Sequence, residues 1–210
     1  MIYLHYSLLF IISYLLGSIP SAYLLIKYFH GKDITKEGSG NAGAMNSYDV
    51  SKSKYTGIVV FIIDFLKGLI PAIIFVFYLK IDPAVLVPLF FAVVLGHNFS
   101  IWLKFKGGRG LATSAGIAVI INFWILIIWI ALFLIANLIK KNVHIDNVFA
   151  TILMPIIVIF GREFILPYSN GINTFGLLFS LCSVISIAIL LKHIEPIIDI
   201  IKGKNNILNK

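Results

Sequence analysis

Long apolar runs follow one another along the chain, and short polar segments separate them. The runs cover residues 3–26, 55–79, 84–102, 111–139, 147–160 and 173–191. About 20 apolar residues are enough for a helix to cross a bilayer, and these runs lack the period of two that is typical of a half-buried strand. Backbone amides inside a bilayer must be bonded within the chain. We therefore predict an all-α, polytopic transmembrane helical bundle that forms a single domain over residues 1–210.

The first run differs from a signal peptide in two respects. No basic segment precedes it, and it is longer than the apolar region of such a peptide. We therefore expect residues 3–26 to form a spanning helix that stays in the protein.

The run 111–139 is longer than one span requires and contains a polar residue, Asn122, followed by Phe123 and Trp124. It forms either one tilted helix or a short helix, a turn near Asn122 and a second helix. With the split, only Lys80 and Arg162 lie on one side of the membrane. Because basic residues gather on the cytoplasmic side, the split is favoured, with about seven spans, the N-terminus outside and the C-terminus in the cytoplasm. The basic side then holds Lys27, Lys32, Lys36, Lys52, Lys54, Lys104, Lys106, Arg109, Lys140, Lys141, Lys192, Lys202, Lys204 and Lys210.

The composition agrees with a membrane protein. The chain is 60% hydrophobic and 12% charged, whereas soluble domains carry about 25% charged residues. The net charge of +8 is explained by cytoplasmic loops, and anionic lipid headgroups or phosphorylated substrates remain possible partners, whereas nucleic acid is not expected. The single cysteine, Cys182, and the scattered histidines have no metal-ligand spacing, so we expect neither a metal nor a cofactor.

Two glycine-rich segments, "GSGNAGAMN" at 38–46 and "FKGGRG" at 105–110, fall on the predicted cytoplasmic side. Gly38, Gly40 and Gly43 allow successive backbone amides to surround an anion, and Ser39 and Asn41 add side-chain donors. Either segment alone is better explained as an ordinary flexible loop. Both on one membrane face, with cations in the second, indicate a phosphate site. Those cations are Lys104, Lys106 and Arg109.

Four further polar residues lie within or beside apolar runs. His97 and His193 each have two interpretations: a hydrogen bond to a neighbouring carbonyl, or a role in orienting a phosphate or accepting a proton. Asp64 and Lys67 are three positions apart, share a helix face and can pair. Charges inside a membrane are costly, and we interpret this pair as an ion pair that supports the site rather than as a direct substrate contact.

Together these motifs resemble the bacterial integral-membrane glycerol-3-phosphate acyltransferases that use acyl phosphate as the donor. That family is marked by a "GSGNxGxTN" loop, a "GH…FKGGKGxAT" segment and a "RHxxN" segment near the C-terminus. This chain has "GSGNAGAMN", "GHNFSIWLKFKGGRGLAT" and "KHIEP", in the same order, together with "DFLKG" and "GSIPSAYLL". The resemblance implies transfer of an acyl group to the first hydroxyl of glycerol 3-phosphate, giving lysophosphatidic acid and phosphate. It also implies a role in phospholipid synthesis at the bacterial cytoplasmic membrane.

The resemblance carries site roles onto matching residues of this chain. The expected catalytic residues are Ser39, His97, Arg109 and His193, and the expected substrate-binding residues are Gly38, Gly40, Asn41, Gly43, Asn46, Gly107, Gly108 and Gly110. Lys104 and Lys106 join the binding set on their charge alone. Six positions depart from the family pattern: Met45 replaces Thr, Arg109 replaces Lys, Lys192 replaces Arg, Pro196 replaces Asn, and Asp49 and Thr35 stand where Arg is common.

The departures keep two other functions open. One is a diverged relative that binds phospholipid or acyl phosphate without transferring the acyl group. The other is a transporter of phosphorylated small molecules. The transporter is less favoured because the polar motifs fall on one side of the membrane and no internal repeat is visible in the sequence.

Overall fold

The computed structural model describes residues 2–203, and this part of the chain contains helices and connecting loops but no strand. The all-α fold class is therefore confirmed. Lys204 and Lys210 lie outside the described residues. The helices that run along the long axis are α1 (Ile2–Ser18), α4 (Lys54–Ile73), α5 (Pro83–Asn98), α6 (Leu111–Ile121), α7 (Phe123–Lys140), α8 (Val143–Phe160) and α10 (Phe175–Leu191).

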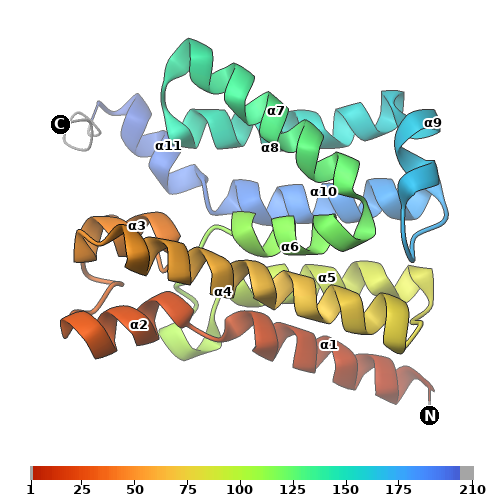
Figure 1. The fold of residues 1–210 in the computed structure, drawn as a ribbon, viewed down its shortest axis with the longest axis horizontal. Coiled ribbons are helices and arrows are strands. Elements are labelled where there is room, and N and C mark those ends of the chain that lie inside the picture. The colour runs from red at the N-terminus through yellow and green to blue at the C-terminus, as the bar shows by residue number, and fades with distance from the viewer. Residues whose placement is uncertain (1, 204–210) are drawn as a thin grey trace.

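The remaining helices lie at the ends of this bundle (Figure 1). Short helices α2 (Ser21–His30), α3 (Ala44–Ser51) and α11 (Ile194–Ile201) gather at one end, and α9 (Arg162–Ile165) lies at the other end, where the N-terminus also lies but on the opposite side of the bundle. Helices α1, α4 and α5 form one group, α7, α8 and α10 form a second, and α6 lies between them. The polar motifs, which are far apart in the sequence, are thus brought to the end of the bundle that holds α2, α3 and α11.

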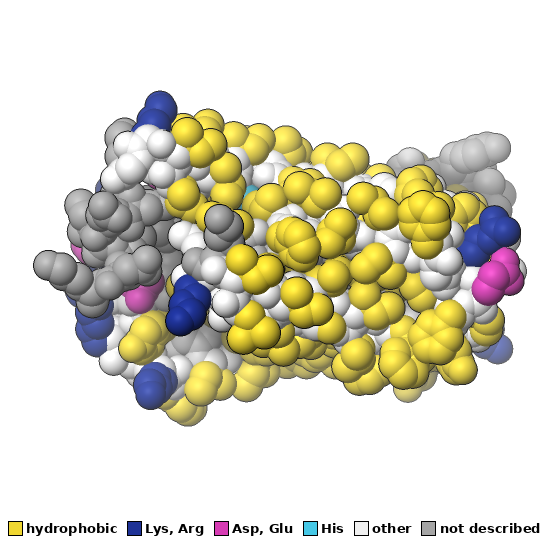
Figure 2. Space-filling model, turned by 90° about the horizontal axis from the view of Figure 1, so that it is seen from above, with side chains coloured by type: hydrophobic (Ala, Val, Ile, Leu, Met, Phe, Trp, Pro, Cys, Tyr) yellow, Lys and Arg dark blue, Asp and Glu magenta, His cyan; other side chains and the backbone are white. Residues whose placement is uncertain are grey.

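The surface is that of a multi-pass membrane protein. On the face shown in Figure 2, hydrophobic side chains cover the middle, and charged side chains lie toward the two ends. Within residues 2–203, four helical segments are long and apolar enough to span a bilayer, or five if α10 and α11 count as one bent span. Helices α6 and α7 are apolar but shorter. The total of about seven spans and the orientation of the termini stay predictions.

The break at Asn122 confirms the split of the long run 111–139. Asn122 is fully buried and caps α7, because its Oδ1 accepts a hydrogen bond from the Trp124 backbone N–H at 3.0 Å. Its Nδ2 donates to the Ile165 carbonyl at 2.7 Å and to Ser169 Oγ at 2.8 Å. One side chain therefore lies between α6 and α7 and ties this turn to the end of α9 and to Ser169 after it.

The first apolar run is interrupted, whereas the sequence pattern predicted one continuous helix over residues 3–26. Helix α1 ends at Ser18 and α2 begins at Ser21, with Pro20 between them. Proline has no backbone N–H and clashes with the preceding turn, so it ends the helix here. The break leaves the Ile19 carbonyl outside the helical hydrogen-bond pattern, and this carbonyl accepts a hydrogen bond from Lys67 Nζ at 2.6 Å.

Glycines hold two helix pairs at close range. A side chain at Gly17 of α1 would collide with the Val93 carbonyl of α5, and one at Gly96 of α5 would collide with the Tyr14 carbonyl of α1. Helices α4 and α6 repeat this arrangement: Gly68 faces the Thr113 carbonyl, and Gly116 faces that of Phe65. Small residues allow such close backbone approach between membrane helices, where the hydrophobic effect does not drive association.

Candidate active site

Asn46 shapes the first glycine loop from inside. Its side chain is 2% exposed, and its Oδ1 accepts a hydrogen bond from the Ser39 backbone N–H at 2.9 Å. Its Nδ2 donates to the carbonyls of Glu37 and Asn41 at 3.1 and 2.9 Å. Gly38 has a φ of +57°, and a Cβ there would overlap the Asn46 side chain. The amide of Asn46 is thus committed to the loop and does not face a ligand.

The second glycine loop packs directly against the first. The Ala42 N–H donates to the Gly107 carbonyl at 3.2 Å, and the Gly108 N–H donates to the His97 carbonyl at 3.0 Å. A side chain at Gly108 would overlap the His97 ring. Gly110 has a φ of +81° and leads into α6. The convergence of the two loops expected from the sequence is therefore present.

A charged cavity of about 320 Å³ lies between these loops and the start of α11. The first loop contributes a hydroxyl, a glycine and an amide, and the second contributes two cations and a glycine. The turn between α10 and α11 adds a third cation, and α11 adds two carboxylates. The lining residues are Thr35, Ser39, Gly40, Asn41, Lys106, Gly107, Arg109, Lys192, Glu195, Pro196 and Asp199.

Arg109 and Lys192 place positive charge on the inner wall of this cavity. Burial lowers the pKa of the Arg109 guanidinium, and the nearby Glu195 carboxylate opposes this effect. A guanidinium stays charged in proteins despite such a shift, and its planar fork suits a phosphate. Lys192 Nζ lies 5.1 Å from the centroid of the Phe99 ring, a cation–π contact that holds the side chain in place.

The structure brings together only some of the predicted site residues. The cavity is lined by Ser39, Gly40, Asn41, Lys106, Gly107 and Arg109. The others do not line it: Gly38 and Gly43 lie within the first loop, Asn46 lies in α3, Gly108 and Gly110 lie deeper in the second loop, His97 and His193 are buried, and Lys104 is exposed. Sequence reasoning did not place Glu195 and Asp199 in the site, although their spacing of four puts both on one face of a helix.

The six departures from the family pattern fall into two groups. Thr35, Arg109, Lys192 and Pro196 line the charged cavity, whereas Met45 and Asp49 do not. The Thr35 hydroxyl donates to Asp33 Oδ1 at 2.7 Å, which lowers the pKa of the Asp33 carboxyl. The Thr35 hydroxyl therefore already donates its proton within the protein, to Asp33.

His97 lies beneath the second glycine loop, in a buried polar cluster around Asp64. Asp64 Oδ1 accepts hydrogen bonds from Ser21 Oγ at 2.6 Å and from Lys67 Nζ at 2.7 Å. His97 Nδ1 is 3.7 Å from the same oxygen. Lys67 Nζ also donates to Ser21 Oγ at 2.9 Å. The predicted Asp64–Lys67 ion pair is confirmed, and it joins α2 to α4 below the loop.

His193 is the residue just before α11, makes no side-chain capping hydrogen bond there and is 1% exposed. Its Nδ1 lies 2.8 Å from the Ile189 carbonyl. A carbonyl only accepts, so Nδ1 carries the proton and Nε2 has no partner among the described residues. The His144 ring packs edge-on against it, with 6.1 Å between centroids. Of the two interpretations of His193, the hydrogen bond to a neighbouring carbonyl is present.

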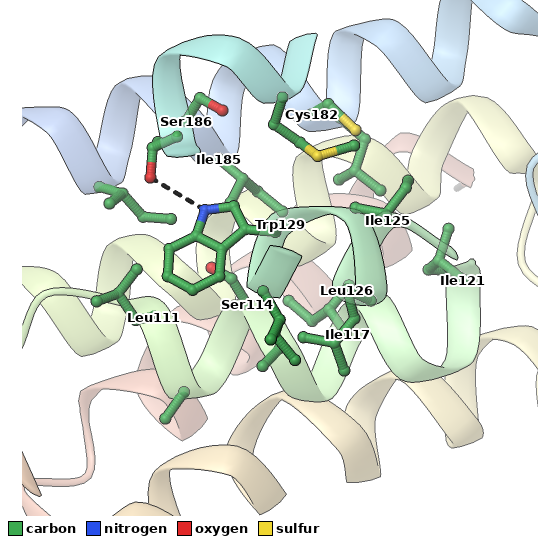
Figure 3. A pocket seen from close by; sticks show the side chains of 18 of the residues that line it. Leu111, Ser114, Ile117, Ile121, Ile125, Leu126, Trp129, Cys182, Ile185 and Ser186 are labelled. Carbon is green, nitrogen blue, oxygen red and sulfur yellow. Dashed lines mark hydrogen bonds between the residues drawn. The ribbon is translucent and has the colours of Figure 1, made fainter. Parts of the chain in front are cut away.

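An apolar pocket of about 240 Å³ lies between α6, α7, α8 and α10 (Figure 3). Residues close in sequence line it and the charged cavity: Leu111 follows Arg109 by two positions, and Ile189 precedes Lys192 by three. Trp129 lies across it, and its Nε1 donates to Thr151 Oγ1 at 3.2 Å, the dashed line in Figure 3. Cys182, a free and buried cysteine, lies in its wall.

The comparisons with known proteins all match one family. The glycerol-3-phosphate acyltransferase family profile matches residues 7–203. Glycerol-3-phosphate acyltransferase 2 of Lactobacillus acidophilus is 38% identical over 80% of each chain. The glycerol-3-phosphate acyltransferase of Aster yellows witches'-broom phytoplasma is 33% identical over 98% of this chain and 97% of its own.

Two crystal structures agree with this match. Both are of PlsY (YgiH), an integral membrane glycerol 3-phosphate acyltransferase. Its glycerol 3-phosphate form has a TM-score of 0.79 and 32% identity, covering 95% of this chain and 94% of that one. Its lysophosphatidic acid form has a TM-score of 0.77, with 31% identity and 95% and 93% coverage. The fold and the sequence give one answer: this chain belongs to the glycerol-3-phosphate acyltransferase family.

Proposed function

We propose that the protein transfers a fatty acyl group from acyl phosphate to the first hydroxyl of glycerol 3-phosphate, giving lysophosphatidic acid and phosphate. The observation that carries the proposal is that Arg109 in the charged cavity and Leu111 in the apolar pocket are only two positions apart in the chain. A phosphate fits beside Arg109 and the glycine loops, and an acyl chain fits along α6 from Leu111 onward. The family relatives named for this activity, in bacteria, support the same reaction at the bacterial cytoplasmic membrane.

The reaction needs positioning and charge stabilisation more than a nucleophilic side chain. The acceptor oxygen bonds to the acyl carbon, the bond from that carbon to the phosphate oxygen breaks, and the departing phosphate takes the proton. Both substrates are anions that repel each other, and Lys106, Arg109 and Lys192 offset that repulsion. Holding two reactants together contributes roughly 7–11 kcal/mol to catalysis where the geometry is right.

In this arrangement the two loops have separate roles. Ser39 and Asn41 donate to phosphate oxygens from the first loop. Arg109 stabilises the charge that develops on the leaving phosphate. His97 supports the second loop from beneath, as its contact with Gly108 requires, and acts as a positioning residue rather than a catalytic one.

The direct test incubates purified protein in lipid with palmitoyl phosphate and labelled glycerol 3-phosphate. Labelled lysophosphatidic acid is the expected product. Ser39→Ala removes a donor from the cavity wall and should lower the rate roughly 10²-fold. Ser7→Ala, at an exposed position of α1 away from the cavity, is the matched control and should leave the rate unchanged. Binding of both ligands without product would instead favour the non-catalytic relative.

A further inference from the structure

Helix α11 brings two carboxylates to a cavity that is otherwise suited to anions. The axis of α11 departs from that of α10 by 49°, and the turn between them includes Lys192. Glu195 and Asp199 lie one turn apart on α11, and both line the charged cavity. Neither is fully buried. The fold itself does not need these carboxylates in its core, so their position calls for a functional explanation.

The cavity keeps its positive and negative charges apart. Among residues 2–203, no nitrogen of Lys106, Arg109 or Lys192 lies within 4.0 Å of an oxygen of Glu195 or Asp199. The groups are still close enough to interact, since the Glu195 carboxylate raises the pKa of Arg109 against the effect of burial. Ligand-facing charges of both signs are therefore available in one cavity.

A phosphate alone does not account for this arrangement. Carboxylates repel a dianion, so two of them in a purely phosphate-binding cavity would weaken binding. An ionised carboxylate accepts hydrogen bonds and cannot donate them. The matching ligand therefore has a phosphate at one end and hydrogen-bond donors at the other.

Pro196 contributes no polar side-chain group to the cavity. It lies between the two carboxylates in sequence, lines the same cavity and replaces the Asn that is usual in the resembled family pattern. A proline side chain has no polar atom. On the α11 wall of the cavity, polar side-chain contacts with a ligand thus fall to Glu195 and Asp199.

We propose that Glu195 and Asp199 bind the hydroxyl groups of the acceptor and determine its specificity, an inference that rests on the proposed function. The phosphate of glycerol 3-phosphate lies against Lys106 and Lys192, which leaves Arg109 to the departing phosphate, and the acceptor hydroxyls donate to the two carboxylates. O–H···O⁻ hydrogen bonds are short and strong. They also orient the first hydroxyl, which attacks the acyl carbon held at the mouth of the apolar pocket.

The test compares two acceptors that share a phosphate and a primary hydroxyl. 3-Hydroxypropyl phosphate lacks only the middle hydroxyl of glycerol 3-phosphate. In the wild type, glycerol 3-phosphate should be preferred in both calorimetric binding and kcat/KM. Glu195→Gln and Asp199→Asn should each raise the KM for glycerol 3-phosphate about 10- to 100-fold and bring the preference toward one. The KM for palmitoyl phosphate should change less than about twofold, because the carboxylates do not contact that substrate.

Glu163→Gln is the matched control, since Glu163 is exposed, pairs with Arg162 and lies outside the cavity. It should leave every constant unchanged. An unchanged preference in both cavity variants would overturn the proposal, and so would tighter binding of glycerol 3-phosphate, which would show that the carboxylates only repel phosphate. Tighter binding of phosphoethanolamine than of glycerol 3-phosphate by the wild type would also overturn it, in favour of an ammonium ligand.

Binding and turnover separate this inference from the proposed function. If the wild type binds glycerol 3-phosphate without forming product, the proposed function fails. The binding preference for glycerol 3-phosphate and its loss in Glu195→Gln and Asp199→Asn would then still support hydroxyl recognition. Absence of any glycerol 3-phosphate binding by the wild type would overturn the inference.

Discussion

Two groups of charges lie on opposite sides of the second glycine loop, and they are organised differently. Beneath the loop, Asp64 and Lys67 have side chains that are 2% and 8% exposed, and they are bonded to each other and to Ser21. Above it, an open cavity is lined by Lys106, Arg109, Lys192, Glu195 and Asp199, and within residues 2–203 no ion pair joins them. Paired, buried charges fix the shape of the loop, whereas unpaired charges are available to a ligand. Substitutions should therefore affect folding on one side and catalysis on the other.

The largest expected effect is on the buried side. Asp64→Leu leaves the Lys67 ammonium buried without its carboxylate, and removing one partner of a buried ion pair typically costs about 3–5 kcal/mol. We expect thermal unfolding in detergent to show this loss of stability. In the double variant Asp64→Leu/Lys67→Met no buried charge is stranded, so most of the stability should return. A single variant as stable as the wild type would show that the pair does not hold the loop.

On the open side, Arg109→Ala should act on catalysis alone. The guanidinium lines the cavity, and loss of one group that stabilises charge in the transition state typically lowers kcat by roughly 10²–10³-fold. The unfolding temperature should stay near that of the wild type. Arg109→Lys keeps the charge but loses the planar fork, and it should recover part of the rate. A large drop in stability would place Arg109 with the structural charges instead.

Much of this division was predictable from the sequence, because it depends on local chemistry. The glycine loops, the spacing of Asp64 and Lys67 and the isolated Asn122 each have a short-range physical consequence that holds in the fold. The roles of His97 and Asn46 were not predictable in the same way. Both occur within motifs, but their side chains point into the loops that the motifs form, and only the packing of the two loops decides that.

The α11 carboxylates show a second limit. A spacing of four places Glu195 and Asp199 on one helix face, but the direction of that face depends on the bend after α10. Pro196 accounts for the break at Lys192, because it has no N–H to donate to the Lys192 carbonyl and its ring clashes with that carbonyl, but it does not set the direction in which α11 then runs. The sequence spacing therefore predicts that Glu195 and Asp199 share a helix face, but it does not predict that this face lines the cavity.

A smaller effect is expected where glycines hold helices together. Gly116→Ala places a methyl group against the Phe65 carbonyl and forces α4 and α6 apart. Overpacking of this kind typically costs about 1–3 kcal/mol, measurable as lower thermal stability in detergent. Gly176→Ala in α10 is the matched control, because among the described residues a Cβ there would meet no atom of another helix or of a nearby side chain within 4 Å. That control should be neutral or gain up to about 1 kcal/mol from the higher helix propensity of alanine.

The smallest predicted effect uses salt to distinguish the two groups of charges. Raising the ionic strength from about 0.1 M to about 1 M shortens the Debye length from about 10 Å to about 3 Å, which screens exposed charges more than buried ones. The KM for glycerol 3-phosphate should rise about three- to tenfold, while the stability supplied by Asp64 and Lys67 should change by less than about 1 kcal/mol. Lys106→Gln removes one cavity cation, and its KM should depend less on salt than that of the wild type. Salt that lowered stability and left KM unchanged would contradict this prediction. The assignment of structural charges to the buried side of the loop and ligand-binding charges to the cavity side would then be wrong.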